Sequence, residues 1–313
     1  MVQTAARFRF LVNPHFAEIP TSNTILYTRP GRFHIRGYKT TLTLKSVAAG
    51  CIRYRTRQSR YLVDDSKFLI FNPGQEYDTD ILPEDHTDAM TFFFQPGFME
   101  GAAQSHHRST DGEPDSGSDD HALKEHGFFE RLYAKEGKVA GVLRAIRADI
   151  RHLHADPSWL EDRFYDLAHG LLDLHAQTKR EVDALPVQRA ATREELYRRL
   201  HHARDFLYAS YAEPLTVQDA AKVACLSPFH FHRMFKMAFQ QTPMSYLQQR
   251  RLDVARVLLA RTEQPITTIC TEVGFESLGS FSWLFRRKMG LSPRQFRAAL
   301  RPDAATTPTD CRP

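Results

Sequence analysis

No stretch of this 313-residue chain stays apolar for long enough to span a lipid bilayer. The first residues, Met1 to Arg7, lack the apolar core of a secretory signal peptide. These two absences argue against a membrane-spanning or exported protein, so we expect a cytoplasmic chain with no membrane partner. The length allows two domains, each with a core of its own.

Cysteine is scarce, and its spacing carries no metal signature. The four cysteines are Cys51, Cys225, Cys270 and Cys311, and no two of them form a CxxC pair. Reduced thiols fit this pattern, with Cys225 and Cys270 as small residues that pack between helices. We therefore expect neither a metal nor another cofactor.

The whole chain has a net charge of only +5, and most of it has no excess of charge of one sign. The excess that exists is local, because residues 193–301 contain 17 Lys and Arg against 9 Asp and Glu. A basic imbalance within one segment is typical of a surface that faces phosphates, although a solvated basic face gives the same count.

The first hundred residues alternate β-branched or aromatic runs with turn signals such as Asn72-Pro73-Gly74. The runs predict strands at residues 24–27, 40–47, 51–55, 67–71 and 90–94. Short strands at this spacing are typical of a sandwich or a barrel. We therefore assign residues 1–100 to one β-domain.

Residues 101–122 differ in character, because Ser, Asp, Gly and His dominate and little can be buried. They are expected to form a mobile loop. Apolar side chains then recur at helical spacing in residues 138–154 and 159–177, with a proline between the two runs. This pattern predicts a helical hairpin within residues 123–182, which either covers the β-domain or forms a dimer interface.

After an expected linker at residues 183–191, residues 192–302 carry one pattern twice. Each copy, at 215–236 and at 266–286, has a helix of small residues, a tight turn and an aromatic, basic helix. A helix-turn-helix unit of this kind places its second helix in the major groove of DNA. The repeat therefore predicts an all-α domain with two DNA-reading units, joined by one long helix at 244–260.

The second helix of each copy, here called the reading helix, has an apolar stripe that is expected to be core. The stripe residues are Phe231, Met234 and Phe235 in the first copy and Phe281, Leu284 and Phe285 in the second. Other positions of the first reading helix face outward. Arg233 is the candidate for a bidentate contact to guanine or for a phosphate clamp. Phe229 suits a thymine methyl group, His232 suits a base edge, and Lys236 adds positive charge.

A set of residues at fixed spacing runs through residues 196–300. Its members are Arg251-Leu252, Ala255, Leu258-Leu259, Ile266, Ile269-Cys270, Val273-Gly274-Phe275, Phe281, Phe285 and Gly290-Leu291-Ser292-Pro293-Arg294-Gln295-Phe296-Arg297. This set resembles the DNA-binding domain of the AraC/XylS family of transcription regulators. The resemblance implies promoter DNA and RNA polymerase as partners. It places base-contacting sites on Phe229, His232 and Arg233 in the first unit and on Leu278, Gly279 and Trp283 in the second.

The second unit departs from the family pattern, which often has polar or basic side chains at the last three of these positions. Leu278, Gly279 and Trp283 cannot form bidentate hydrogen bonds to bases. We therefore expect the second unit to contact phosphates and thymine methyl groups. The residues expected to contact phosphates are Ser277, Ser280, Arg286 and Arg287. The alternative is that Trp283 is partly packed and takes no part in DNA binding.

The same resemblance implies an N-terminal cupin-like β-barrel that binds a small-molecule effector and helps to form a homodimer. Residues 67–74 are similar to a strand and turn that recur in such barrels. The expected fold class is thus multi-domain: a cupin-like β-barrel with a helical hairpin, followed by an all-α double helix-turn-helix domain.

Three arginines offer a candidate effector site. Arg53, Arg55 and Arg57 alternate along a predicted strand and are expected to share one face, where they would bind an anion. The alternatives are a solvated strand face, or pairing with the acidic region Asp78 to Asp80.

The function expected from these patterns is sequence-specific DNA binding by an effector-responsive transcription regulator, with activation as the commoner mode in similar proteins. A metal-dependent cupin-type enzyme fused to a DNA-binding domain is the first alternative, but the histidines do not gather: His34 is alone and His86 lies in a turn. His106 and His107 lie in the expected loop, so no enzyme is predicted. The second alternative is a DNA-binding protein of low sequence specificity.

Overall fold

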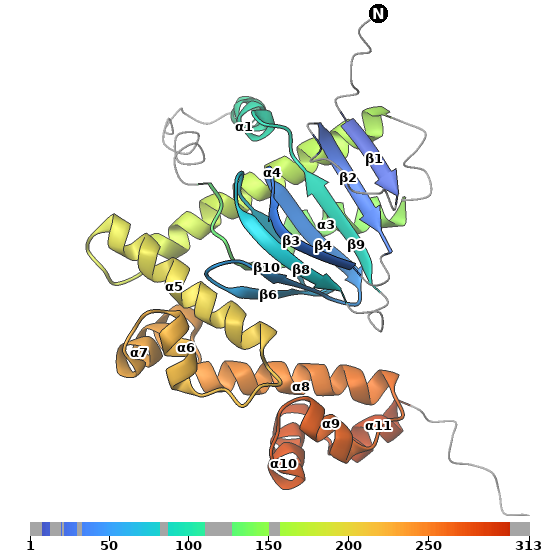
Figure 1. Ribbon diagram of the computed structural model, residues 1–313, viewed down its shortest axis with the longest axis vertical. Coiled ribbons are helices and arrows are strands. Elements are labelled where there is room, and N and C mark those ends of the chain that lie inside the picture. The colour runs from blue at the N-terminus through green and yellow to red at the C-terminus, as the bar shows by residue number, and fades with distance from the viewer. Residues whose placement is uncertain are drawn as a thin grey trace, which may run out of the picture. The chain divides into compact units, whose positions relative to one another are not determined.

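The computed structural model divides the chain into two compact units, Met1–Ala209 (unit 1) and Ser210–Pro313 (unit 2) (Figure 1). It describes residues 8–12, 20, 22–29, 33–81, 87–109, 127–149 and 157–300. Unit 1 combines two β-sheets with helices, whereas the secondary structure described in unit 2 is helical.

The two sheets of unit 1 have the strand orders β1-β2-β9-β4-β7-β10 (sheet A) and β3-β8-β5-β6 (sheet B). The strands are β1 (Phe8–Val12), β2 (Asn23–Thr28), β3 (Phe33–Lys39), β4 (Thr43–Ala49), β5 (Ile52–Arg55), β6 (Arg60–Val63), β7 (Lys67–Phe71), β8 (Glu76–Ile81), β9 (Asp88–Phe93) and β10 (Leu132–Ala134). Strands β1 and β2 pair in parallel, and the other pairs are antiparallel.

The expected closed cupin-like barrel is not formed by the described residues, because no strand pairing joins sheet A to sheet B there. The edge strand β6 of sheet B instead packs against helix α5 (Ala190–Ala209). A helix over an edge strand occupies the place where a further strand would pair and continue the sheet. The β-domain is therefore sheet-rich, as expected, but it consists of two separate sheets.

One face of sheet A forms the main core of unit 1 together with three helices. These helices are α1 (Phe98–Ser109), α3 (Gly137–Ala148) and α4 (Pro157–Asp183). Phe164 of α4 is central, since the rings of Phe92, Phe94 and Phe98 lie 6.4, 5.7 and 6.1 Å from its ring. Helices α3 and α4 pack against each other and lie across sheet A (Figure 1). The expected pair of amphipathic helices is thus present and covers the sheet.

The opposite face of sheet A contacts sheet B through aromatic side chains. The ring of Phe71 on β7 stacks on that of Tyr77 on β8 at 4.5 Å, and Tyr54 on β5 lies 5.7 Å from Phe71. All three residues are buried. Sheet A therefore has apolar side chains on both faces, one toward the helices and one toward sheet B.

The five strands predicted from the sequence correspond to β2, β4, β5, β7 and β9. The expected loop at 101–122 is wrong for residues 101–109, which continue α1 and include the backbone of His106 and His107. The rest of that stretch, 110–122, and the turn that contains His86 lie outside the described residues.

Helix α5 is fixed to the rest of unit 1 by buried polar contacts. The Asp205 carboxylate accepts hydrogen bonds from the Leu132 N–H at 2.7 Å and from the Arg204 guanidinium at 2.8 Å. The Tyr208 hydroxyl donates to Asp64 at 2.6 Å. Because Asp205 is fully buried, the hydrogen bonds from Leu132 and Arg204 compensate the cost of removing its charge from water.

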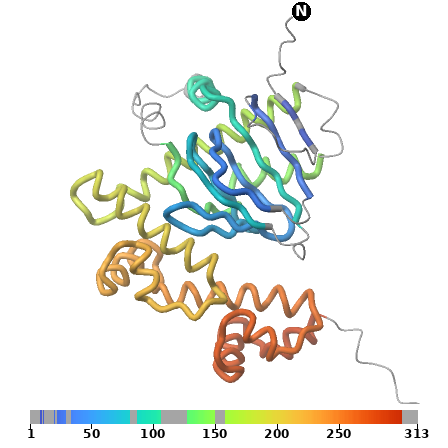
Figure 2. The backbone as a smooth tube through the Cα atoms, in the orientation of Figure 1, coloured from blue at the N-terminus to red at the C-terminus, as the bar shows by residue number. Residues whose placement is uncertain are grey.

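Unit 2 contains six helices among the described residues. They are α6 (Val217–Val223), α7 (Pro228–Phe239), α8 (Pro243–Arg261), α9 (Ile266–Glu272), α10 (Leu278–Met289) and α11 (Pro293–Ala299). The long helix predicted at 244–260 is α8, a continuous rod that contacts α6 and α7 as well as α9 and α11 (Figure 2).

Candidate nucleic-acid interface

The two halves of unit 2 form their helix-turn-helix turns with the same backbone hydrogen bonds. In the first turn, the N–H groups of Ala224, Cys225 and Leu226 donate to the carbonyls of Ala220, Lys222 and Ala221. In the second, those of Val273, Gly274 and Phe275 donate to the carbonyls of Ile269, Thr271 and Cys270. The sequence repeat is therefore also a repeat of backbone geometry.

Each turn needs one residue in the left-handed backbone conformation. Gly274 adopts it at φ 88° in the second turn, and glycine does so at little steric cost. The first turn places Cys225 there at φ 50°, where a β-carbon is disfavoured. The turns also differ in length, because Ser227 caps α7 two positions after Cys225, whereas Ser277 caps α10 three positions after Gly274.

The first reading helix, α7, is capped at its start and packed along one side. The Ser227 side chain accepts a hydrogen bond from the backbone of His230, and Pro228 occupies the first turn. The expected core residues Phe231, Met234 and Phe235 are buried. Burial of this stripe leaves the opposite side of the helix free for a ligand.

The exposed side of α7 contains the four predicted DNA-contacting residues, Phe229, His232, Arg233 and Lys236. Phe229 is 82% exposed, so most of its ring is accessible to a ligand. Apolar, hydrogen-bonding and cationic groups therefore lie along one accessible helix face. Such a combination can contact thymine methyl groups, base edges and phosphates.

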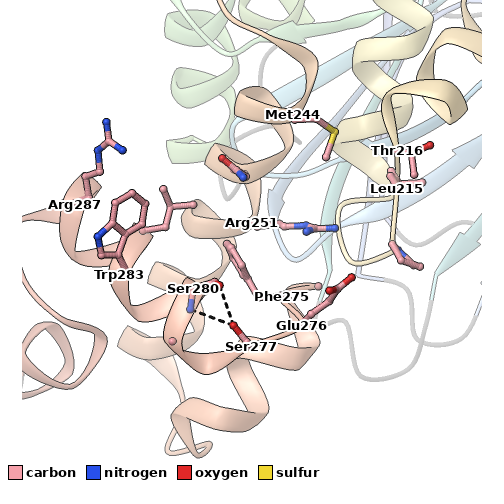
Figure 3. A pocket seen from close by; sticks show the side chains of 15 residues that line it. Leu215, Thr216, Met244, Arg251, Phe275, Glu276, Ser277, Ser280, Trp283 and Arg287 are labelled. Atoms are coloured by element: carbon pink, nitrogen blue, oxygen red, sulfur yellow. Dashed lines mark hydrogen bonds between the residues drawn. The ribbon is translucent and has the colours of Figure 1, made fainter. Parts of the chain in front are cut away.

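The second reading helix, α10, begins at the Ser277 cap. Ser277 accepts a hydrogen bond from the Ser280 N–H at 3.2 Å and donates one to the Ser280 hydroxyl at 2.9 Å (Figure 3). Phe281 and Phe285 are buried, and Leu284 packs partly against the same core. The exposed residues of this helix include Leu278, Gly279, Ser280, Trp283, Arg286 and Arg287.

Trp283 projects from α10 rather than into the core. Its side chain is 61% exposed, and the Arg287 guanidinium lies 5.1 Å from its ring centroid. Arg286, Arg287 and Lys288 together make the last turn of the helix strongly basic. An aromatic ring with an adjacent cation presents both an apolar plane and a positive charge on one surface.

Contacts that sequence reasoning did not predict connect the two halves. Arg251 of α8 donates hydrogen bonds to the carbonyls of Tyr211 at 2.7 Å and Glu213 at 2.8 Å. A β-carbon on Gly274 would lie 2.8 Å from the carbonyl oxygen of Ala212. The second turn thus packs directly on the segment that precedes α6, and α8 is tied to the same segment. These contacts restrict how the two reading helices move relative to each other.

A hollow of about 850 Å³ lies between the start of α6, the first half of α8 and the beginning of α10. Thr216 borders it on one side and Ser277, Trp283 and Arg287 on the other (Figure 3). Met244, Gln248 and Arg251 of α8 also line it. Hydroxyl groups, a guanidinium and an exposed indole thus border a single concavity.

The role of Thr216 was also not predicted from the sequence, although the capping pattern that indicates it is present there. Thr216 caps α6 and Asp219 completes a capping box, the pattern of a Ser or Thr followed three residues later by an acidic residue. A hydrogen bond from the Thr216 hydroxyl, with another from its backbone N–H, lowers the pKa of the Asp219 carboxyl. Arg251 had no such local signal, because its partners lie far away in the sequence.

The three arginines proposed for an effector lie in unit 1, and two of them are on the side of sheet B that faces away from sheet A. Arg53 and Arg55 are exposed on β5, whereas Arg57 lies beyond the end of that strand. The register places Arg53 opposite Asp80 and Arg55 opposite Asp78. This arrangement favours the alternative in which the arginines face carboxylates rather than a ligand.

Among the described residues, no three His, Cys, Asp or Glu side chains are grouped so as to hold a metal ion. His34 contacts Asp80, with its Nδ1 2.8 Å from a carboxylate oxygen. In the same part of the chain, no helix combines the length and apolarity needed to cross a membrane.

Comparison with known proteins finds relatives that match part of the chain. The family model described as a helix-turn-helix domain matches residues 220–299. The regulatory protein SoxS of Escherichia coli strain K12 is 38% identical over 88 residues, which cover 28% of this chain and 82% of SoxS. The transcriptional activator RhaS of Enterobacter sp. strain 638 is 37% identical over 99 residues, 32% of this chain and 36% of RhaS.

The chain spans only about a third of the length of several longer curated relatives that it matches. Among solved structures, it is similar to the DNA-binding domain of AdpA, a global transcriptional factor crystallised in complex with a target DNA. That match has 26% identity and a TM-score of 0.32, and it covers 33% of this chain and 96% of the AdpA domain.

Proposed function

The chain belongs to the AraC/XylS family of transcription regulators, and on this premise we propose that it binds a specific promoter sequence in response to a small-molecule effector. The single observation that supports sequence specificity is the exposed face of α7. There, Phe229, His232 and Arg233 are accessible while the apolar stripe behind them is buried. These three side chains supply the apolar and hydrogen-bonding groups that distinguish bases in the major groove.

The two reading helices would have different tasks. In α7, Arg233 makes the base contact and Lys236 contacts phosphate. In α10, Ser277, Ser280, Arg286 and Arg287 bind phosphates, because Leu278, Gly279 and Trp283 offer no bidentate hydrogen bonds. The exposure of Leu278 (42%) and Trp283 (61%) supports apolar contact with thymine methyl groups over the alternative of a packed indole.

The spacing of the two units supports simultaneous binding. Successive major-groove segments on one side of B-DNA are about 34 Å apart. Helix α8 has 19 residues, and at the rise of an α-helix this corresponds to about 28 Å. With the width of the flanking helices added, a rod of this length is suited to present two reading helices to neighbouring groove segments.

Unit 1 would regulate the binding of unit 2 to DNA. We propose that an effector bound to unit 1, or a homodimer contact through its helices, changes how unit 2 is presented to the promoter, and that the bound regulator contacts RNA polymerase. Activation is the proposed mode, supported by the description of RhaS as a transcriptional activator. The enzyme alternative gains no support from SoxS or RhaS, both of which are described as regulators.

The remaining competitor is a DNA-binding protein of low sequence specificity, favoured by the apolar surface of α10. Footprinting of the full chain on the DNA upstream of its own gene, with excess unrelated DNA, separates the two functions. A specific regulator protects two patches about one helical turn apart, and its affinity falls steeply with salt. Uniform retention of all DNA would favour the competitor, and a folded chain that binds no DNA in dilute buffer would refute both.

A further inference from the structure

The first two turns of α10 present carbon rather than paired hydrogen-bonding groups to the surface. Leu278 is 42% exposed and Trp283 is 61% exposed. Gly279, which is also exposed, carries no side chain. Among the side chains of these three residues, the indole N–H of Trp283 is the one hydrogen-bonding group, and it donates without accepting. The three positions that the family resemblance assigns to base contacts in α10 therefore form an apolar surface.

Gly279 leaves an open space beside the indole. Residues four positions apart are neighbours on a helix face, so Gly279 lies next to Trp283, one turn earlier. A β-carbon at Gly279 would meet nothing within 4 Å. Gly279 and Trp283 both line the hollow of unit 2, together with Ser277 at the start of the helix (Figure 3). The edge of a base can thus approach the α10 backbone closely and rest against the indole.

A cation lies over the indole and adds positive charge beside it. The Arg287 guanidinium, one turn further along the helix, is 5.1 Å from the ring centroid of Trp283. The ring and the guanidinium attract each other, which favours the outward orientation of the indole. Arg286 and Lys288 make the same end of α10 basic. Phosphate contacts by this basic end would hold the indole against the base edges of the adjoining groove.

The major groove offers one kind of apolar group to such a surface. Adenine, guanine and cytosine present hydrogen-bond donors and acceptors there, whereas thymine adds a methyl group on C5 to its acceptor. Contact between apolar side chains and this methyl group removes both from water, but contact with a polar edge leaves a hydrogen bond unmade. Cytosine that is methylated at C5 carries the same group at the same ring position. A surface that recognises this group therefore treats 5-methylcytosine like thymine, and cytosine like uracil.

We propose that α10 recognises the C5-methyl group of pyrimidines, so that methylation of cytosine in the target DNA strengthens binding of this protein. Leu278 and Trp283 contact the methyl group, and Gly279 admits the base edge that carries it. The placement of α10 in a major groove rests on the proposed function, whereas the chemical group that it recognises is a separate claim. In α7, by contrast, His232 and Arg233 supply hydrogen bonds, whose partners on the bases a methyl group on C5 leaves unchanged.

The test is equilibrium binding of the full chain to the footprinted DNA with single base pairs exchanged. At each pyrimidine of the two protected patches in turn, the pair is made T·A, U·A, C·G or 5-methylcytosine·G. At one or two positions of one patch, T·A and 5-methylcytosine·G should bind alike and about three- to fivefold more tightly than U·A and C·G. Recognition by hydrogen bonds gives a different order, in which T·A equals U·A and C·G equals 5-methylcytosine·G.

Four variants assign this order to α10. Trp283→Ala should make the four duplexes bind alike at the methyl-dependent position, and Leu278→Ala should narrow the difference between them. Because both side chains are exposed, neither variant should lower the melting temperature by more than a few degrees. Phe229→Ala removes an exposed apolar side chain from the other reading helix and should preserve the order at that position. Arg286→Ala should weaken binding to all four duplexes by the same factor.

The proposal is overturned if uracil binds like thymine at every position of both patches. It is also overturned if 5-methylcytosine binds like cytosine wherever uracil weakens binding. The same conclusion holds if Trp283→Ala, folded like the parent chain, keeps the parent order at every methyl-dependent position. Each of these results leaves the specific footprint, and with it the proposed function, intact.

If footprinting finds no specific site, the comparison is made on an unrelated duplex in which every thymine is replaced by uracil or every cytosine by 5-methylcytosine. Tighter binding of the forms that carry more methyl groups, lost in Trp283→Ala, would support methyl recognition although the proposed sequence specificity had failed. Equal binding of all forms would overturn both.

Discussion

The guanidinium of Arg251, in the middle of α8, donates a hydrogen bond of 2.7 Å to the backbone carbonyl of Tyr211. It donates another to the carbonyl of Glu213, and its charge lies 5.7 Å from the centroid of the Phe275 ring. One side chain on the connecting helix thus contacts both the segment before the first helix-turn-helix unit and the turn of the second.

Replacement of Arg251 by Met should lower the free energy of unfolding by about 2–3 kcal/mol, because two carbonyls lose charged donors. It should also weaken binding to DNA that engages both units, since their relative orientation loosens. Arg256→Met on the exposed side of the same helix is the matched control and should change stability by less than about 0.5 kcal/mol. Equal effects of both variants in chemical denaturation would argue against this role for Arg251.

Comparison of Gly274→Ala with Gly290→Ala distinguishes the loss of stability caused by backbone strain from the loss caused by crowding of the new β-carbon. Both glycines have positive φ, at 88° and 79°, so both variants lose about 1–2 kcal/mol from the backbone. Only at Gly274 would the new β-carbon meet backbone, 2.8 Å from the Ala212 carbonyl oxygen, whereas nothing lies within 4 Å at Gly290. Gly274→Ala should therefore cost about 1–3 kcal/mol more in denaturation experiments. Equal losses would mean that the packing of the turn on Ala212 is unimportant.

Arg233→Ala and Arg287→Ala should affect DNA binding in different ways. Loss of Arg233 should cost about 1–3 kcal/mol on the preferred site and relax the preference at one base pair. Loss of Arg287 should weaken binding to all sequences alike and reduce the dependence of affinity on salt. The measurement is equilibrium binding to the footprinted site and its single-base variants at several salt concentrations. The reverse pattern would exchange the two assignments.

Trp283→Ala tests whether the exposed indole serves DNA or the fold. Because Trp283 is 61% exposed, its loss should change the free energy of unfolding by less than about 0.5 kcal/mol while weakening DNA binding. Phe285→Ala, at a fully buried position two residues later, should cost about 3–5 kcal/mol. If thermal melting shows a large loss of stability for Trp283→Ala, the indole is a packing residue and its proposed role in DNA binding fails.

Asp205→Ala should be among the most destabilising changes in unit 1. It removes the buried acceptor of the Leu132 N–H and leaves the Arg204 guanidinium, 15% exposed, without its carboxylate, at a cost of about 3–5 kcal/mol. Asp183→Ala breaks an exposed pair with Arg193 and should cost less than about 1 kcal/mol. Comparable unfolding midpoints for the two variants would contradict the view that α5 is held by its buried polar contacts.

The sequence predicted those strands and helices that are indicated by a short run of neighbouring residues. The β-branched and aromatic run at 67–71 is β7, and the long helix predicted at 244–260 is α8. Strand β8 was not predicted, because its Glu76, Asp78 and Asp80 alternate with Tyr77 and Thr79 and so interrupt the β-branched and aromatic run that indicates a strand.

Features that depend on contacts between residues far apart in the sequence could not be predicted from such runs. Closure of a barrel depends on which strand edges meet, and the presence of α5 against β6 is not visible in either segment alone. The link from Arg251 to Tyr211 joins residues 40 positions apart. Lys45 shows the same limit, because nothing in its neighbourhood of Thr, Leu and Ser indicates that the lysine faces aromatic rings from another sheet.

Helix α8 also determines how this architecture tolerates insertions. In an α-helix each added residue turns everything beyond it by about 100° and advances it by about 1.5 Å. One extra residue in α8 would therefore swing α10 away from the groove, whereas seven extra residues would restore its direction to within about 20°. In the proposed complex, the angular relation of the two DNA contacts therefore depends on the length of α8, which can change only in steps of nearly whole helical turns.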